Sequence, residues 1–181
     1  MKWLPKLFIA VGLILGLIEN LYATTIHFNA SSLGGNRWEY NYSITNDTLT
    51  SSIEEFTIFF NYGQYDHLIV TMPLAGWDEI TADPALILNF PDNGFYDALA
   101  LSSGIVPGST ASGFSVSFDW LGIGTPGSQQ FAIVDPTTLV DLDTGTTIIT
   151  PEPSTVLLLS LGLAVFVGFG RTTWLSPKYY L

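Results

Sequence analysis

Two stretches in which apolar and polar residues alternate limit what this chain can fold into. In residues 38–45 and 114–120, every second residue is aromatic or aliphatic, and the residues between them are mostly polar. Side chains of a β-strand point alternately to the two faces of a sheet, so each stretch has one apolar face. An apolar sheet face must be buried against another layer. The two stretches therefore predict packed β-sheets.

Shorter segments of the same kind surround these two, and turn residues separate them every eight to twelve positions. We predict strands at residues 24–30, 56–60, 68–72, 77–80, 85–90, 130–134, 138–142 and 146–150, and turns at 31–36, 61–64, 92–94, 104–113, 122–128 and 143–145. Residues 95–101 fit either a strand or one helical turn. The sequence therefore predicts an all-β fold, an antiparallel β-sandwich. Residues 105–120 resemble the loop and strand of Ig-like bacterial surface domains.

Charge is distributed very unevenly along the chain. Within residues 24–150, Arg37 is the only basic residue against fourteen acidic ones, a net formal charge of −13. Such a domain repels phosphate backbones, so the sequence excludes nucleic acid as a partner. The 181 residues include no cysteine, which excludes disulfides, thiol nucleophiles and thiolate metal sites. Residues 24–150 form one domain, long enough to bury a core without such links.

The first 23 residues predict a secretory signal peptide with a short helix. Lys2 and Lys6 precede an uncharged apolar stretch at residues 7–18, and a more polar segment ends at Ala23. Twelve apolar residues are few for a membrane span, which favours a cleaved signal over an anchor. We expect cleavage between Ala23 and Thr24, which exports the domain of residues 24–150.

The C-terminal region combines a short motif, an apolar stretch and a basic residue. Pro151, Glu152, Pro153 and Ser154 precede residues 155–170, which carry no charge, and Arg171 follows them. A helix over residues 154–170 would be about 25 Å long, slightly less than the hydrocarbon core of a bilayer. We therefore predict a transmembrane helix. The positive-inside rule places the tail, residues 175–181, in the cytoplasm and the domain on the opposite side of the membrane.

Residues 151–174 resemble the PEP-CTERM sorting signal of Gram-negative bacteria, because motif, apolar helix and basic end follow one another at the C-terminus of an exported chain. A single arginine, Arg171, stands where that family has a cluster. The resemblance implies an inner-membrane precursor, processing near Pro151-Glu152-Pro153 by an exosortase-type membrane protease, and release to the cell surface or extracellular matrix beside exopolysaccharide. The alternative is a permanent C-terminal anchor in which Pro-Glu-Pro only starts the helix.

Motifs for catalysis or cofactor binding are weak in this chain. Residues 122–127 match G-x-G-x-x-G, but a strand pattern follows where a dinucleotide site needs a helix, so we predict a turn and no cofactor. His27 and His67 are the only histidines. Asp66 and His67 should point to opposite faces of a strand, which argues against a catalytic pair. We therefore predict a protein that is not an enzyme.

Ligand binding is the remaining functional class. Trp77 lies among Gly76, Asp78 and Glu79, and it is our candidate for an exposed aromatic that contacts a carbohydrate. Residues 141–145 (Asp-Leu-Asp-Thr-Gly) fit a hairpin turn better than a calcium loop. Residues 92–97 form an oxygen-rich loop that leaves a calcium site open. We predict an exported surface or matrix protein. The alternative is a carbohydrate- or calcium-binding module that stays anchored in the membrane.

Overall fold

The computed structural model describes residues 24–150, which form twelve β-strands and no helix. The strands are β1 (Thr25–Gly34), β2 (Arg37–Thr45), β3 (Glu55–Phe60), β4 (Tyr65–Val70), β5 (Trp77–Ala82), β6 (Ala85–Ile87), β7 (Phe90–Asp92), β8 (Gly94–Ala100), β9 (Thr110–Trp120), β10 (Gln130–Val134), β11 (Asp141–Thr146) and β12 (Ile148–Ile149). The prediction of an all-β fold is confirmed.

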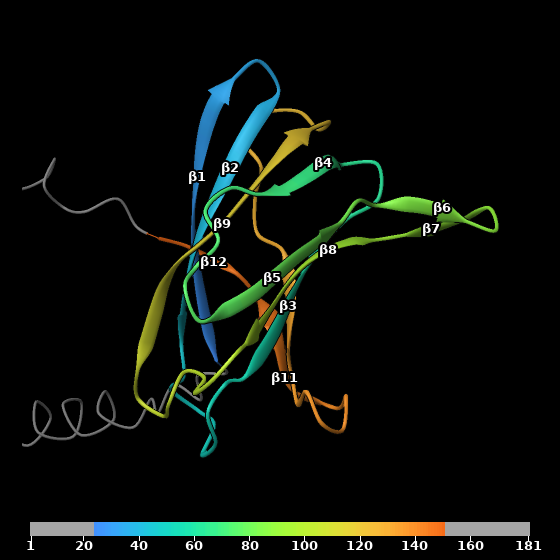
Figure 1. Cartoon of the computed structure of the whole chain (residues 1–181). Coiled ribbons are helices and arrows are strands. Elements are labelled where there is room, and N and C mark those ends of the chain that lie inside the picture. The colour runs from blue at the N-terminus through green and yellow to red at the C-terminus, as the bar shows by residue number, and fades with distance from the viewer. Residues whose placement is uncertain (1–23, 151–181) are drawn as a thin grey trace, which may run out of the picture. The chain divides into compact units, whose positions relative to one another are not determined.

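These strands form two five-stranded sheets and a separate two-stranded hairpin (Figure 1). The first sheet has the order β12-β1-β2-β9-β4, and the second has the order β11-β10-β3-β8-β5; β6 and β7 form the hairpin. All pairs are antiparallel except β1 and β12, which are parallel. The expectation of purely antiparallel pairing is wrong there, because β12 reaches the first sheet by crossing over from β11 in the second. A crossover between sheets does not impose the antiparallel direction of a hairpin.

Aromatic rings from both sheets meet between them, so the two sheets form a β-sandwich. The ring of Phe118 on β9 lies 5.9 Å from that of Phe60 on β3. At the other end of the same strands, Phe114 and Phe56 meet edge to face at 5.0 Å. All four side chains are fully buried. The alternation at residues 114–120 therefore supplies the core, as predicted, and that at residues 38–45 does the same from β2.

Two of the turns predicted from the sequence are wrong. Residues 92–94 link the end of β7 directly to β8, and the chain instead reverses at Leu88 and Asn89, where φ is 52° and 67°. Residues 143–145 lie inside β11, and the strand expected at residues 138–142 begins only at Asp141. The reversal there follows Asp135, whose carboxylate accepts hydrogen bonds from the backbone N–H groups of the next turn.

Residues 95–101, which the sequence left undecided, form most of β8 in the middle of the second sheet. The first turn is tighter than predicted, because β1 continues to Gly34 and β2 begins at Arg37. Gly34 and Gly35 have φ values of 105° and 61°, which side chains rarely allow. The predicted turns at residues 61–64 and 122–128 lie between strands as expected. The loop predicted at residues 104–113 ends earlier, because β9 begins at Thr110.

The predicted signal peptide, sorting motif and transmembrane helix lie outside the described residues. The chain divides into two units, residues 1–149 and 150–181. Within residues 24–150 no helix is long and apolar enough to cross a membrane.

Candidate functional site

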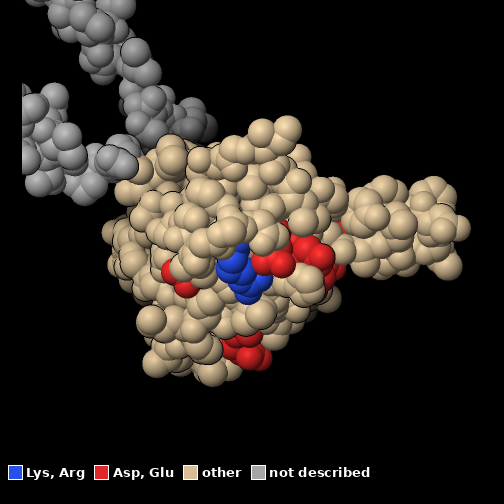
Figure 2. Space-filling view, turned by 90° about the horizontal axis from the view of Figure 1, so that it is seen from above, with Lys and Arg blue, Asp and Glu red and all other residues tan. Residues whose placement is uncertain are grey.

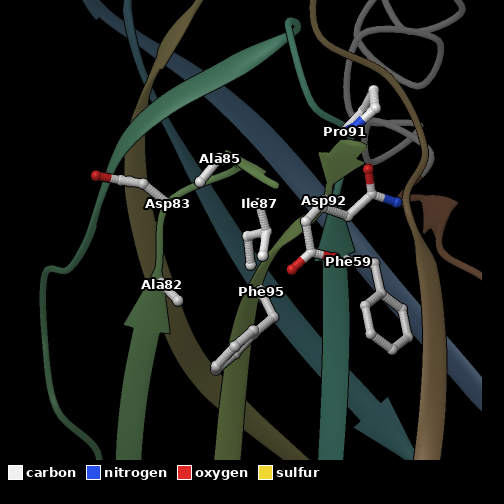
Figure 3. Close-up of a pocket in the computed structure, with 9 residues that line it drawn as sticks. Phe59, Ala82, Asp83, Ala85, Ile87, Pro91, Asp92 and Phe95 are labelled. Carbon is white, nitrogen blue, oxygen red and sulfur yellow. The ribbon is translucent and has the colours of Figure 1, made fainter. Parts of the chain in front are cut away.

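A hollow lies where the β6–β7 hairpin leaves the outer face of the second sheet. Its volume is about 590 Å³, and Figure 3 shows its lining. The lining side chains come from the ends of β3, β5 and β8 and from the hairpin itself: Phe59, Ala82, Asp83, Ala85, Ile87, Pro91, Asp92, Asn93 and Phe95. None of them was a candidate in the sequence analysis except Asp92 and Asn93.

The floor of this pocket is formed by Phe59 and Phe95, which are paired across β3 and β8. Neighbouring residues on both strands, Ile58, Phe60 and Tyr96, point into the core and are fully buried. Because side chains alternate along a strand, the two phenylalanines must point outward. Ala82 on β5 stands opposite Phe95 and continues the apolar floor.

Gly94 allows the hairpin to rise directly from the edge of the sheet. A Cβ atom at this position would lie 2.5 Å from the carbonyl oxygen of Ala82 and 2.5 Å from Cδ of Pro84. Any side chain would therefore push the hairpin away from the sheet and open the pocket. Asn93, next to it, holds the neighbouring β3–β4 turn, since its Oδ1 accepts a hydrogen bond of 3.0 Å from the backbone N–H of Tyr62.

The two carboxylates at the pocket rim do not converge. Asp83 Oδ1 accepts a hydrogen bond of 2.6 Å from the backbone N–H of Leu68, which fixes it as a structural acceptor. Figure 3 shows the Asp83 carboxylate directed away from the pocket floor and that of Asp92 turned toward Phe95. The lining therefore combines an apolar floor with one inward carboxylate and includes no basic side chain. It suits a neutral or cationic ligand with a flat apolar face and disfavours an anionic one.

A cluster of polar side chains lies on the outer face of the first sheet, around the only lysine or arginine within residues 24–150. Arg37 on β2 contacts Asp119 on β9, with Nη1 3.2 Å from Oδ1, and donates from Nη2 to the Ser117 hydroxyl at 2.7 Å. His67 on β4 joins them through Nδ1, 3.0 Å from Asp119 Oδ2. Figure 2 shows the basic patch with acidic atoms directly beside it.

The sequence analysis predicted that the side chains of Asp66 and His67 point to opposite faces of a strand, and this prediction is wrong. The pairing of β4 with β9 shifts register between Asp66 and Ile69, and His67 has φ 49°. This irregularity turns His67 so that Nδ1 lies 3.7 Å from Asp66 Oδ2, although Asp119 is closer. Strict alternation holds only where the ladder is regular.

This cluster is arranged to stabilise the sheet. Desolvation opposes ionisation of Asp119, but hydrogen bonds from Arg37 and His67 outweigh it and lower the pKa of this carboxyl below its usual range. The Ser117 hydroxyl accepts a hydrogen bond from Arg37, and the nearest partner of His67 is a carboxylate. Arg37 also donates to the His67 carbonyl at 2.8 Å. The network therefore ties β4 to β2 and β9 at its irregular point.

Trp77, the candidate for carbohydrate contact, packs partly against the core. Its ring lies 5.0 Å from Phe114 and 5.9 Å from Phe56. Trp77 begins β5, whereas Ala82, at the pocket, ends it. The proposed contact residue and the pocket therefore lie at opposite ends of one strand.

The oxygen-rich segments are used within the fold. Asp97 accepts a hydrogen bond from the Thr57 hydroxyl, and Asp143 accepts one of 2.7 Å from the backbone N–H of Thr24. In the part of the chain that the structure describes, no three His, Cys, Asp or Glu side chains are grouped so that they could hold a metal ion.

The pocket could have been suspected from Phe59, which interrupts the apolar–polar alternation of residues 56–60. Searches of protein-family models, curated proteins and solved structures found no match to this chain.

Proposed function

We propose that this chain is an exported, non-enzymatic surface or extracellular-matrix protein with a PEP-CTERM sorting signal. In this proposal residues 1–23 are a cleaved signal peptide, and residues 24–150 are an acidic, Ig-like sandwich facing the periplasm. Residues 154–170 hold the precursor in the inner membrane. An exosortase-type protease then acts at Pro151-Glu152-Pro153, and the sandwich reaches the cell surface or matrix, in association with exopolysaccharide.

The observation that carries this proposal is the agreement between the sandwich and the two predicted processing sites. Strand β1 starts at Thr25, two residues after Ala23, and β12 ends at Ile149, two residues before Pro151. Both predicted cleavages therefore fall outside β1 and β12, as release of an intact sandwich requires.

Thr24 provides a second reason to place the first cleavage after Ala23. Thr24 is 2% exposed, and its backbone nitrogen lies 2.7 Å from Asp143 Oδ2. Cleavage would turn this amide into a protonated α-amino group at neutral pH. The hydrogen bond would then become a charge-assisted ion pair between the new N-terminus and β11. Maturation would thus strengthen the contact between the two sheets.

The test of processing uses the full precursor in its native host, with one epitope tag directly after Thr24 and another at Leu181. We expect an extracellular product that carries the first tag and lacks the second. If both tags stay on a single membrane-bound chain, the anchor is permanent and the sorting half of the proposal is wrong. Retention of residues 1–23 on the mature product would contradict the signal-peptide half.

Asp143→Asn tests the ion pair on the mature protein. We expect the substitution to lower the free energy of unfolding by about 1 kcal/mol when Thr24 is the free N-terminus. The matched control is the same substitution in a chain that keeps Ala23, where Thr24 remains an amide and the loss should be smaller. Urea denaturation measures both. Equal losses in the two chains would show that no ion pair forms.

A second candidate function is carbohydrate binding, and the pocket over Phe59 and Phe95 favours it. Flat apolar rings next to the Asp92 carboxylate match a sugar ring with one apolar face and free hydroxyl groups. We expect the chain to bind a neutral polysaccharide such as cellulose and not polygalacturonate, and Phe95→Ala to weaken binding about tenfold. Co-sedimentation measures this, with Trp77→Ala as the control. Loss of binding only in Trp77→Ala would move the site to that residue.

A further inference from the structure

Two hollows on the outer face of the second sheet meet at Phe59. The first is the pocket over Phe59 and Phe95, and the second, of about 240 Å³, lies over β10 and β11. Phe59 is part of both linings, and the second hollow is also lined by Gln130, Ala132 and Thr144. The pocket therefore continues past Phe59 as a shallow groove that crosses the strands.

One row of outward side chains follows this groove, at right angles to the strands. Ala82 on β5, Phe95 on β8 and Phe59 on β3 are paired in register. Gln130 on β10 continues the row, because it pairs with Phe59 on one side and with Thr146 on β11 on the other. Neighbouring strands are about 4.8 Å apart, so a row across five strands is about 19 Å long. The row is longer than one sugar ring and matches a chain of several.

Carboxylates stand on both sides of the aromatic part of the row. Asp92, from the hairpin, is turned toward Phe95 (Figure 3). Asp97 lies two residues beyond Phe95 on the same face of β8, about 7 Å along the strand. Arg37, the only lysine or arginine within residues 24–150, lies on β2 in the other sheet. Within the described residues, the groove therefore combines an apolar floor with negative charge and has no basic side chain.

The carboxylates beyond Phe95 repel one another. Burial raises the pKa of the Asp97 carboxyl, the hydroxyl of Thr57 lowers it, and the charge of Asp78 raises it again. Burial also raises the pKa of the Glu55 carboxyl, and the charge of Asp97 raises it further. A positive charge at this place would relieve the repulsion, because an opposite charge favours the ionised form of a carboxyl. A cationic ligand therefore complements the groove better than a neutral one.

We propose that this groove binds a chain of β-linked amino sugars, a cationic polysaccharide, with sugar rings on Phe95 and Phe59 and ammonium groups beside Asp92 and Asp97. The inference rests on the carbohydrate-binding function proposed for the same pocket, and it names the class of sugar. The apolar faces of the sugar rings would cover the phenyl rings. An ammonium group close to a phenyl ring also gains a cation–π attraction.

A basic peptide carries the same charge, but the position of the row argues against it. Phe59 and Phe95 lie on β3 and β8, which have a neighbouring strand on each side. Extended peptides are commonly recognised through the free backbone groups of an edge strand. In the interior of a sheet these groups are already paired, so the row offers a ligand only its side chains. Such a surface suits sugar rings.

The experiment is isothermal titration calorimetry of the full chain, in micelles of a detergent without sugar headgroups. The ligands are a glucosamine hexamer, cellohexaose and oligolysine, at about pH 6, where primary amines are protonated. We expect the glucosamine hexamer to bind about tenfold more tightly than cellohexaose, because two carboxylates meet its ammonium groups. Added NaCl should reduce this advantage, since salt screens charges at a surface.

Three variants and one control locate the contact. Asp97→Asn and Asp92→Asn should each reduce the preference for the amino sugar about threefold. Phe59→Ala should weaken the binding of both hexamers about tenfold. Glu39→Gln is the matched control, because it removes one negative charge from β2 in the other sheet and should keep the preference. Near-ultraviolet circular dichroism shows that each variant is folded.

The contrary outcomes separate the two proposals. Equal affinities for the two hexamers, or equal effects of Asp97→Asn and Glu39→Gln, would contradict the choice of an amino sugar and leave carbohydrate binding intact. Failure of both hexamers to bind would contradict carbohydrate binding as well. If oligolysine binds as tightly as the glucosamine hexamer and Phe59→Ala changes neither affinity, cations are attracted to the acidic domain in general, and the groove is no sugar site.

Discussion

Phe118 and Phe90 are both phenylalanines on β-strands, yet the first is fully buried and the second is 75% exposed. Phe118 lies on β9, whose inner face is covered by the second sheet, and its ring contacts Tyr40, Phe60 and Tyr65. Phe90 lies on β7, which pairs only with β6. Burial is therefore decided by whether a second layer covers the strand. The hydrophobicity of the residue alone does not decide it.

The largest effect that this comparison predicts is at Phe118. We expect Phe118→Ala to lower the free energy of unfolding by about 3–5 kcal/mol, because it leaves a cavity among rings that cannot close over it. Urea denaturation of the full chain in detergent micelles, followed by near-ultraviolet circular dichroism, measures the loss. A loss in the free energy of unfolding below about 1 kcal/mol would show that the core repacks freely. Burial of Phe118 would then contribute no more to stability than the exposed Phe90 does.

Asp97 lies on the outer face of the second sheet, in an environment between that of the buried Phe118 and that of the exposed Phe90. Burial raises the pKa of this carboxyl, and Asp78 raises it further, although the Thr57 hydroxyl lowers it. A pKa above the unfolded value means that stability falls as pH rises from the unfolded pKa through the folded one. We therefore expect Asp97→Asn to stabilise the protein by less than about 1 kcal/mol at pH 7.

The measurement for Asp97 is a series of urea denaturation curves between pH 3 and pH 7. The gain from Asp97→Asn should shrink toward the acid end, where the wild-type carboxyl is protonated in both states. The control is Asp119→Asn, for which the sign is reversed: Arg37 and His67 lower the pKa of Asp119, so its stabilising contribution is present at pH 7 and fades as pH falls. A loss of stability in Asp97→Asn at pH 7 would mean that the Thr57 hydrogen bond dominates.

The smallest effect is expected at the hairpin. Phe90→Ser should change the free energy of unfolding by less than about 0.5 kcal/mol, because the side chain is already in solvent. Urea denaturation of the full chain measures the change. Destabilisation above about 1 kcal/mol would show that Phe90 packs against the sandwich.

Particular segments show how far sequence patterns reach. The alternation at residues 38–45 and 114–120 correctly identified two central strands and the side chains that fill the core. The Asp-Asn-Gly signal at residues 92–94 failed because Gly94 serves there as the first residue of β8, where a Cβ would collide with Ala82 and Pro84. Turn residues have more than one use, and the surrounding backbone selects among them.

The sequence analysis did not predict the candidate pocket, for a similar reason. Asp92 and Asn93 were noted only as oxygen donors, and Phe59 and Phe95 were not noted at all. They become one pocket because β3 and β8 pair in a register that places Phe59 beside Phe95. The register depends on the core residues between them, which are far apart in sequence.

The sequence by itself determined the class of fold, the acidity of the domain and the order of its parts along the chain, because periodicity and charge are local properties. Only the tertiary structure decided which apolar residues are buried, which edge β12 joins and where the chain leaves the sandwich. These features depend on the pairing of strands distant in sequence and on the layer that covers each face. The same apolar residue thus belongs to the core in β9 and to an open surface in β7.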